Sequence, residues 1–222
     1  MSKPTFSDLA LAAYCPRKLY YRRQEPDRTP PPDVEPVRDL AFRYPDLLDP
    51  GGSDRLRDAP IDVTPTQFRA NLERARARFD AWTGLANPTG REVYLEGREC
   101  RGVAHKVLAS PLVPSIVSPG RPPPEGTWRP QAVKAVAAAK ALAWERNAEI
   151  PRAVVEYPAH GVVRTVRLTT RNRSAYRRTL WTIRSMRGVP SRIRDESKCD
   201  ACEYRTTCGT KTRSLKTLLG LG

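Results

Sequence analysis

The chain has 222 residues, of which 39% are hydrophobic, a length that suits one domain or one domain with a small lobe. No apolar stretch approaches the roughly 20 residues of a membrane helix, and Asp8 interrupts the short apolar run near the N-terminus, so we expect no signal peptide and no membrane partner. The formal net charge of +15 predicts a polyanionic partner, most simply nucleic acid, although a GC-rich genome would also inflate arginine. We therefore expect a cytoplasmic protein.

The first 62 residues divide into two segments. Residues 1–24 are predicted to form a helix that Pro16 breaks directly after Cys15. Residues 25–62 carry many prolines and are predicted to be an irregular linker or insertion.

Residues 63–190 are predicted to form an α/β core. A capping sequence at Thr64 begins a helix that is predicted to run to about Trp82. Strands are predicted at 92–97, 102–109, 113–118, 152–158 and 162–169. Helices are predicted at 129–147 and 171–187. This order predicts a mixed sheet flanked by helices.

Four of the five cysteines are candidates for one metal site. Cys199, Cys202 and Cys208 lie close together, and the first two have the spacing of a metal-binding knuckle. A centre with four ligands needs one more thiol, for which Cys15 is the best candidate and Cys100 the other. Spacing does not distinguish zinc from iron–sulfur, and unliganded thiols are a further alternative.

Two cysteine-bearing segments resemble a known family. YCPRKLYY (14–21) and KCDACEYRTTC (198–208) are similar to segments of the RecB-type exonucleases associated with CRISPR systems. The resemblance implies a [4Fe–4S] cluster, with zinc as the alternative, in a lobe that joins residues 1–24 to residues 191–222. The ligands that it implies are Cys15, Cys199, Cys202 and Cys208.

The same resemblance implies a fold and partners. It implies a restriction-endonuclease-like (PD-(D/E)xK) nuclease core over residues 63–190. It also implies DNA as the partner, single-stranded or end-containing, and a place in antiviral defence beside CRISPR adaptation proteins.

The catalytic motifs of that family are degenerate here. Members carry a G-x-x-D strand, an E-x-K strand and a Q-x-x-x-Y helix. The corresponding positions are His105 for the aspartate, Ser115 and Val117 for the glutamate and lysine, and Gln131 for the glutamine, with Ala135 at the tyrosine. No aspartate occurs between residues 80 and 195. We therefore expect an iron–sulfur DNA-binding protein with a decayed nuclease site.

Two other functions stay open at this point. An active single-strand exonuclease would need Mg²⁺ or Mn²⁺ at a rebuilt site, for which Glu96, Glu99 and His105 are the candidates. A zinc-stapled basic module that binds RNA or a protein is the third possibility. We interpret His105 itself as a half-buried strand residue with a satisfied hydrogen bond.

Two basic segments are candidates for contact with DNA. Tyr20 and Tyr21 adjoin two arginines, a mixture found in single-strand binders, although packing of the rings around the cluster is the favoured reading. In helix 171–187 we expect Trp181 to face inward and the arginines to follow a phosphate backbone, with an ordinary solvated surface as the alternative. The predicted DNA contacts are Arg22, Arg23, Arg173, Arg177, Arg178 and Arg184.

Overall fold

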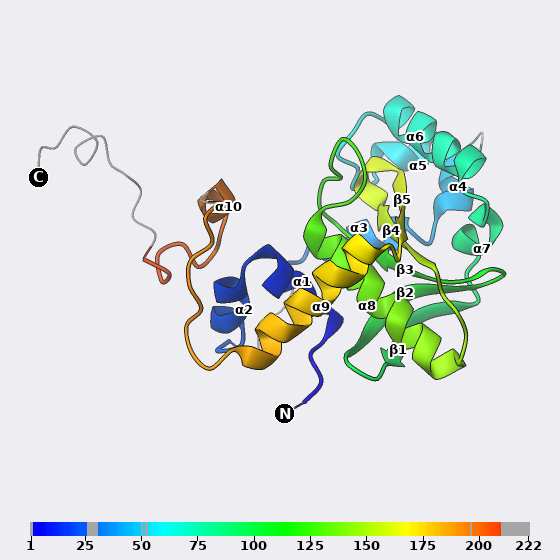
Figure 1. The fold of residues 1–222 in the computed structure, drawn as a ribbon. Helices are drawn as coiled ribbons and strands as arrows, with labels where there is room; N and C mark the ends of the chain where they lie inside the picture. The colour runs from blue at the N-terminus through cyan, green and yellow to red at the C-terminus, as the bar shows by residue number, and fades with distance from the viewer. Residues whose placement is uncertain (1, 26–30, 50, 52, 196, 210–222) are drawn as a thin grey trace, which may run out of the picture.

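The computed structural model describes residues 2–25, 31–49, 51, 53–195 and 197–209. Residues 210–222, the last part of the segment 191–222, lie outside these ranges. Figure 1 shows a central sheet with helices on both sides. Its strands, in spatial order, are β1 (Gly90–Glu96), β2 (Arg101–Ala109), β3 (Leu112–Val117), β4 (Arg152–Tyr157) and β5 (Val162–Arg167). β3 and β4 are parallel and the other neighbours antiparallel, which confirms the predicted mixed sheet.

One face of the sheet is covered by three helices: α1 (Phe6–Tyr14), α8 (Arg129–Arg146) and α9 (Thr170–Ser185). α8 provides the crossover that the parallel pair β3–β4 requires. Its buried side is mostly alanine, which lets the backbone approach the sheet closely. A Cβ atom on Gly97 would lie 2.7 Å from the Cα atom of Ala141, so glycine is required there.

The opposite face is covered partly by the stretch predicted as an irregular linker, and that prediction was wrong. The stretch contains three short helices: α3 (Val34–Leu40), α4 (Tyr44–Leu48) and α5 (Ser53–Arg57). Leu40, Tyr44 and Leu47 are fully buried in a cluster with Phe68. Pro45 lies in the first turn of α4, where a missing N–H costs no helical hydrogen bond. Burial of the apolar residues therefore outweighs the proline content.

Two more helices complete this layer: α6 (Pro65–Arg78) and α7 (Trp82–Ala86). Thr64 caps α6 as predicted, because its side chain accepts a hydrogen bond from the N–H of Gln67. The helix ends at Arg78, before the predicted Trp82, where Phe79 turns to an extended conformation.

The N-terminal helix is broken as predicted. α1 ends before Cys15, which is extended, and α2 (Pro16–Arg22) begins at Pro16. The C-terminal α10 (Ser197–Asp200) lies near α2 in Figure 1. Within the described ranges, none of the helices combines the length and apolar character that crossing a bilayer requires.

Candidate functional site

The two ends of the described chain meet in a small region that we call the terminal lobe: residues 14–25 and 197–209. The hydroxyl of Tyr14 donates a 2.8 Å hydrogen bond to the carbonyl of Lys198. The ammonium of Lys18 lies 3.1 Å from the carboxylate of Glu203. These contacts hold the end of α1 and the start of α2 against residues 198–203.

Aromatic packing adds to the same lobe. The ring of Tyr21 stacks on that of Tyr204, with centroids 5.7 Å apart, and meets Tyr20 edge-on. The Tyr204 hydroxyl donates a 2.8 Å hydrogen bond to Glu25. The two tyrosines of α2 therefore pack within the lobe, whereas their packing around a cluster stays a prediction.

The four candidate thiols lie around Tyr14 and Arg17. The guanidinium of Arg17 donates a 3.4 Å hydrogen bond to the Sγ atom of Cys208. The pKa of Tyr14 is raised first by burial and then by the negative charge of neighbouring thiolates. Those thiolates, in order of effect, belong to Cys202, Cys199 and Cys15.

The donor set and its charge fit a thiolate-bound centre. Four thiolates are the usual ligands of structural zinc and of cubane clusters. The ammonium groups of Lys18 and Lys198 lie 5.4 and 5.8 Å from the Tyr14 ring and, with Arg17, supply positive charge near the sulfurs. In the described residues, no three histidine, cysteine or acidic side chains are yet close enough together to hold a metal ion. The ligand set thus stays a prediction.

Cys100, the alternative fourth ligand, belongs to a different part of the molecule. It is 1% exposed, in the core between the sheet and α8. Its Sγ atom lies 3.4 Å from the Tyr176 hydroxyl, and burial raises the pKa of the thiol. The structure therefore separates Cys100 from the terminal lobe.

The sheet interior, where the resemblance locates a nuclease site, holds a closed polar network. Ser115 donates a 2.5 Å hydrogen bond to Oε1 of Glu156. The ammonium of Lys106 lies 2.8 Å from Oε2 of the same carboxylate. All three side chains are buried, and Val117, at the predicted lysine position, packs in the apolar cluster beside them.

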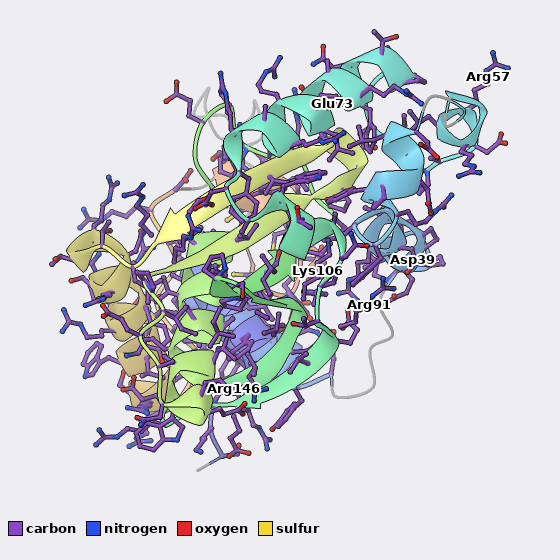
Figure 2. The ribbon with its side chains drawn as sticks, turned by 90° about the vertical axis from the view of Figure 1, so that its right-hand side faces the viewer. Asp39, Arg57, Glu73, Arg91, Lys106 and Arg146 are labelled. Carbon is purple, nitrogen blue, oxygen red and sulfur yellow. The ribbon has the colours of Figure 1, made fainter. Side chains whose placement is uncertain are left out.

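The Lys106 ammonium is fully hydrogen-bonded in the middle of the molecule (Figure 2). Besides Glu156, it donates to the carbonyls of Ala41 at 2.5 Å and Leu85 at 3.0 Å, so each of its three protons has an acceptor. It also lies 4.7 Å from the centroid of the Tyr44 ring. Burial lowers the pKa of Lys106, and the Glu156 charge opposes that shift.

His105, at the aspartate position, is satisfied within the protein. Its Nδ1 atom accepts a 3.1 Å hydrogen bond from the N–H of Val117, which confirms the interpretation made from the sequence, although the ring is buried rather than half-buried. Burial first, and then the charges of Lys134, Arg38 and Lys106, lower its pKa to about 3. The imidazole is therefore neutral near pH 7 and its Nδ1 lone pair is occupied.

Charged groups adjoin this histidine. Lys134 of α8 has a pKa lowered to about 8, first by burial and then by Arg38, with Glu92 opposing. The pKa of Glu92, which lies in β1 with a positive φ of 48°, is raised chiefly by burial. A lysine ammonium thus lies close enough to His105 to disfavour protonation of its ring.

The rebuilt metal site is not assembled. Glu96 lies 2.9 Å from Lys3, and Glu99 hydrogen-bonds Tyr176 at 3.4 Å. Glu96 is paired with Arg101, and His105 lies four residues further along β2, or about 13 Å. These residues do not form a metal-binding group in the described part of the chain.

The remaining family position, Gln131, lies in the first turn of α8. Its amide nitrogen donates a 3.3 Å hydrogen bond to Ser118. The residues that sequence reasoning missed are Lys106 and Glu156. The available signal was a glutamate that directly follows the apolar run AVV in strand β4, since such a carboxylate needs a buried partner.

The arginines predicted to contact DNA lie in different parts of the structure. Trp181 is 71% exposed, so the expectation that it faces inward was wrong. Arg23 lies 3.3 Å from Asp8, and Arg22 donates to the carbonyl of Glu25. The α9 arginines lie on both sides of the buried stripe of that helix: Arg178 on one side, and Arg173, Arg177 and Arg184 on the other.

Comparison with known proteins adds nothing to the description of these sites. No protein-family model matches the chain, and no curated protein matches it.

Proposed function

We propose that this protein is an iron–sulfur DNA-binding protein whose nuclease-like sheet has lost its catalytic metal site. The observation that carries the proposal is the closed network of Lys106, Glu156 and Ser115, beside a neutral His105. Divalent cations that cleave phosphodiesters need carboxylate oxygens open to the ion. Both oxygens of Glu156 accept from internal donors and the side chain is 0% exposed, so binding without cleavage follows.

The DNA-binding part of the proposal is supported by charge. The chain carries 39 basic and 24 acidic residues, and the arginines of α9 are exposed. Arginine grips phosphate in bidentate fashion, so a basic surface of this kind supplies affinity without reading sequence.

The cluster part of the proposal is supported by the contacts of the terminal lobe. A bound cluster would supply a covalent staple between Cys15 and the segment Cys199–Cys208, which closes nearly the whole chain into a loop. Two residues of the lobe would support this staple. Arg17 offsets sulfur charge, and Tyr14 holds the α10 backbone in place.

Metal analysis tests the cluster. Protein purified without oxygen should contain about four iron atoms per chain. The variant Cys202→Ser should lose most of this iron, while the matched variant Cys100→Ser should keep it, because Cys100 lies in the core. Zinc without iron in the wild-type protein would overturn the iron–sulfur assignment in favour of a zinc-stapled module.

A cleavage assay tests the lost site. The iron-loaded protein should bind labelled single-stranded DNA and leave it intact with either Mg²⁺ or Mn²⁺. Cleavage that disappears on changing Glu96, Glu99 or His105 to alanine would show an active exonuclease instead.

A further inference from the structure

The free edge of the sheet is bordered by two basic hollows. β5 is the last strand in the order, and pairs only with β4 among the described strands. A hollow of about 490 Å³ lies between this strand and the starts of α8 and α9, and a second of about 200 Å³ lies between it and α6. Thr165 lines both hollows, but they lie on opposite faces of the sheet, one against α8 and α9 and the other against α6. We call the larger hollow the β5 groove.

Arginines line both hollows, and those of the β5 groove come from three elements. The larger hollow is lined by Arg129, Arg167, Arg171 and Arg178. The smaller is lined by Arg74, Arg78 and Arg164. Glu125 is the single acidic residue that lines either hollow. Such an excess of positive charge in a concave site raises the local concentration of anions.

The arginines of the larger hollow are not neutralised internally. In the described part of the chain, none of these four lies within 4.0 Å of a carboxylate. Arg184, on the other side of α9, does have an acidic neighbour, since it lies 4.0 Å from Glu99. The charges of the groove are therefore available to a ligand, whereas that of Arg184 is shared.

Two long helices begin at the same hollow and add to its positive potential. Thr127 and Arg129 flank the start of α8, and Thr169 caps α9. Trp128, the N-cap residue of α8, makes no side-chain capping hydrogen bond. The first N–H groups of that helix therefore have no capping side chain as their acceptor. The N-terminal ends of helices carry partial positive charge that favours phosphate.

An exposed indole adjoins the β5 groove in the chain: Trp128 lies between Thr127 and Arg129, which line the groove, although its own side chain does not. Trp128 is 49% exposed, and its Nε1 atom donates a 2.8 Å hydrogen bond to the carbonyl of Arg121, which fixes the ring. A fixed aromatic face beside a basic groove is the arrangement on which unpaired bases stack. Duplex DNA would not offer such a base, because its bases are stacked within the helix.

We propose that the β5 groove binds the backbone of single-stranded DNA, with a base stacked on Trp128. This inference rests on the DNA-binding function proposed above and gives it a surface. It selects Arg167, Arg171 and Arg178 over the sequence-predicted set on the other side of α9: Arg173, Arg177 and Arg184. The strand β5 is roughly 17 Å long, enough for several phosphates of one chain.

Two triple variants with equal charge loss test the groove. One changes Arg167, Arg171 and Arg178 to alanine, and the control changes Arg173, Arg177 and Arg184 to alanine. Binding of iron-loaded full-length protein to a fluorescent oligothymidylate of about 15 nucleotides is followed by anisotropy over a range of salt. Three lost phosphate contacts should weaken binding roughly 50-fold at about 0.15 M salt and lower the salt slope by about two. The control should change affinity by less than about threefold.

The stacking step has its own pair of variants. Trp128→Ala should weaken binding of the oligothymidylate roughly tenfold and leave duplex binding unchanged, because stacking on one base contributes about 1–3 kcal/mol. Trp181→Ala, which removes a more exposed indole on α9, should have no effect. Circular dichroism confirms that each variant is folded.

The outcomes are distinguishable. Equal losses in the two triple variants, or a larger loss in the control, would overturn the groove while leaving DNA binding intact. Equal affinity of the wild type for duplex, together with an unchanged Trp128→Ala, would overturn the single-strand assignment. A wild-type protein that carries its iron and binds no DNA at low salt would overturn the proposed function itself.

Discussion

The sheet interior and the terminal lobe both contain side chains of the kinds that bind metals in other proteins. The two regions surround these side chains with different partners. In the interior, Glu156 accepts from Lys106 and Ser115, and His105 accepts from a backbone N–H. In the lobe, the thiols lie beside cations, with Arg17 donating to Cys208. The first region neutralises its carboxylate with an internal ammonium, whereas the second surrounds its thiols with positive charge of the kind that suits thiolate ligands.

The difference shows two ways in which one chain can hold side chains that bind metals. A buried carboxylate must be neutralised by a partner, and a fixed lysine does this without the geometry that hydrolysis requires. Such a network keeps the strands packed but offers no open coordination position. The thiol centre proposed for the terminal lobe would be independent of this network, because it would contribute connectivity rather than reactivity.

Breaking the interior network should give the largest effect. Glu156→Ala leaves the Lys106 ammonium fully buried without its counter-charge, so we expect the free energy of unfolding to fall by about 3–5 kcal/mol. Urea denaturation followed by circular dichroism measures this loss as a lower midpoint.

The double variant Lys106→Met with Glu156→Leu is the control for that experiment. It removes both charges and fills the space with apolar atoms, so it should be at least about 1 kcal/mol more stable than Glu156→Ala alone. A double variant less stable than the single one would mean that the carbonyl bonds of Lys106 to Ala41 and Leu85, and not the ion pair, dominate.

The histidine beside the network should make stability depend on pH. The pKa of His105 is about 3 in the folded protein and near 6.5 when the chain is unfolded, so the unfolded state binds the extra proton between these values. Stability is full above about pH 6.5 and falls with acidification, by roughly 2 kcal/mol between pH 7 and pH 5. Urea denaturation at the two pH values measures the difference.

Two histidine variants separate this effect from general acid sensitivity. His105→Gln should remove most of the pH dependence, because the glutamine side chain does not titrate. His160→Gln should keep most of it, since His160 lies at the turn between β4 and β5 beside Asp62, away from the network. A slope that survives in His105→Gln would assign the dependence to other groups.

Much of the fold could be predicted because its signals are local. The run of β-branched residues in β3 and β4, the alanine-rich α8 and the short connection between β4 and β5 each specify their own structure. The break at Pro16 is equally local. The helices between residues 34 and 57 were missed because proline content suggested a linker, and only burial of Leu40 and Leu47 against α6 decides otherwise.

The sites were less predictable because they depend on register. Lys106 and Glu156 lie on β2 and β4, separated by β3, and nothing in the sequence states that both side chains point to the same layer. The periodicity of α9 identified a buried stripe but not its edges, so Trp181 was placed inside and Arg178 was grouped with arginines on the other side. The β5 groove needs β5, α8 and α9 brought together, which no local pattern reveals.

The smallest expected effect tests whether the terminal lobe opens independently of the sheet. Tyr14→Phe removes the hydrogen bond to the Lys198 carbonyl, which contributes about 0.5–1.5 kcal/mol. Because this bond joins α1 to α10 and does not reach the sheet, amide exchange in residues 197–209 should accelerate about fivefold while exchange in β2–β4 stays unchanged. Tyr94→Phe, on exposed β1, is the control and should alter neither. If Tyr14→Phe accelerated exchange in the strands as well, lobe and sheet would unfold as one unit, and the independence of the two regions would be lost.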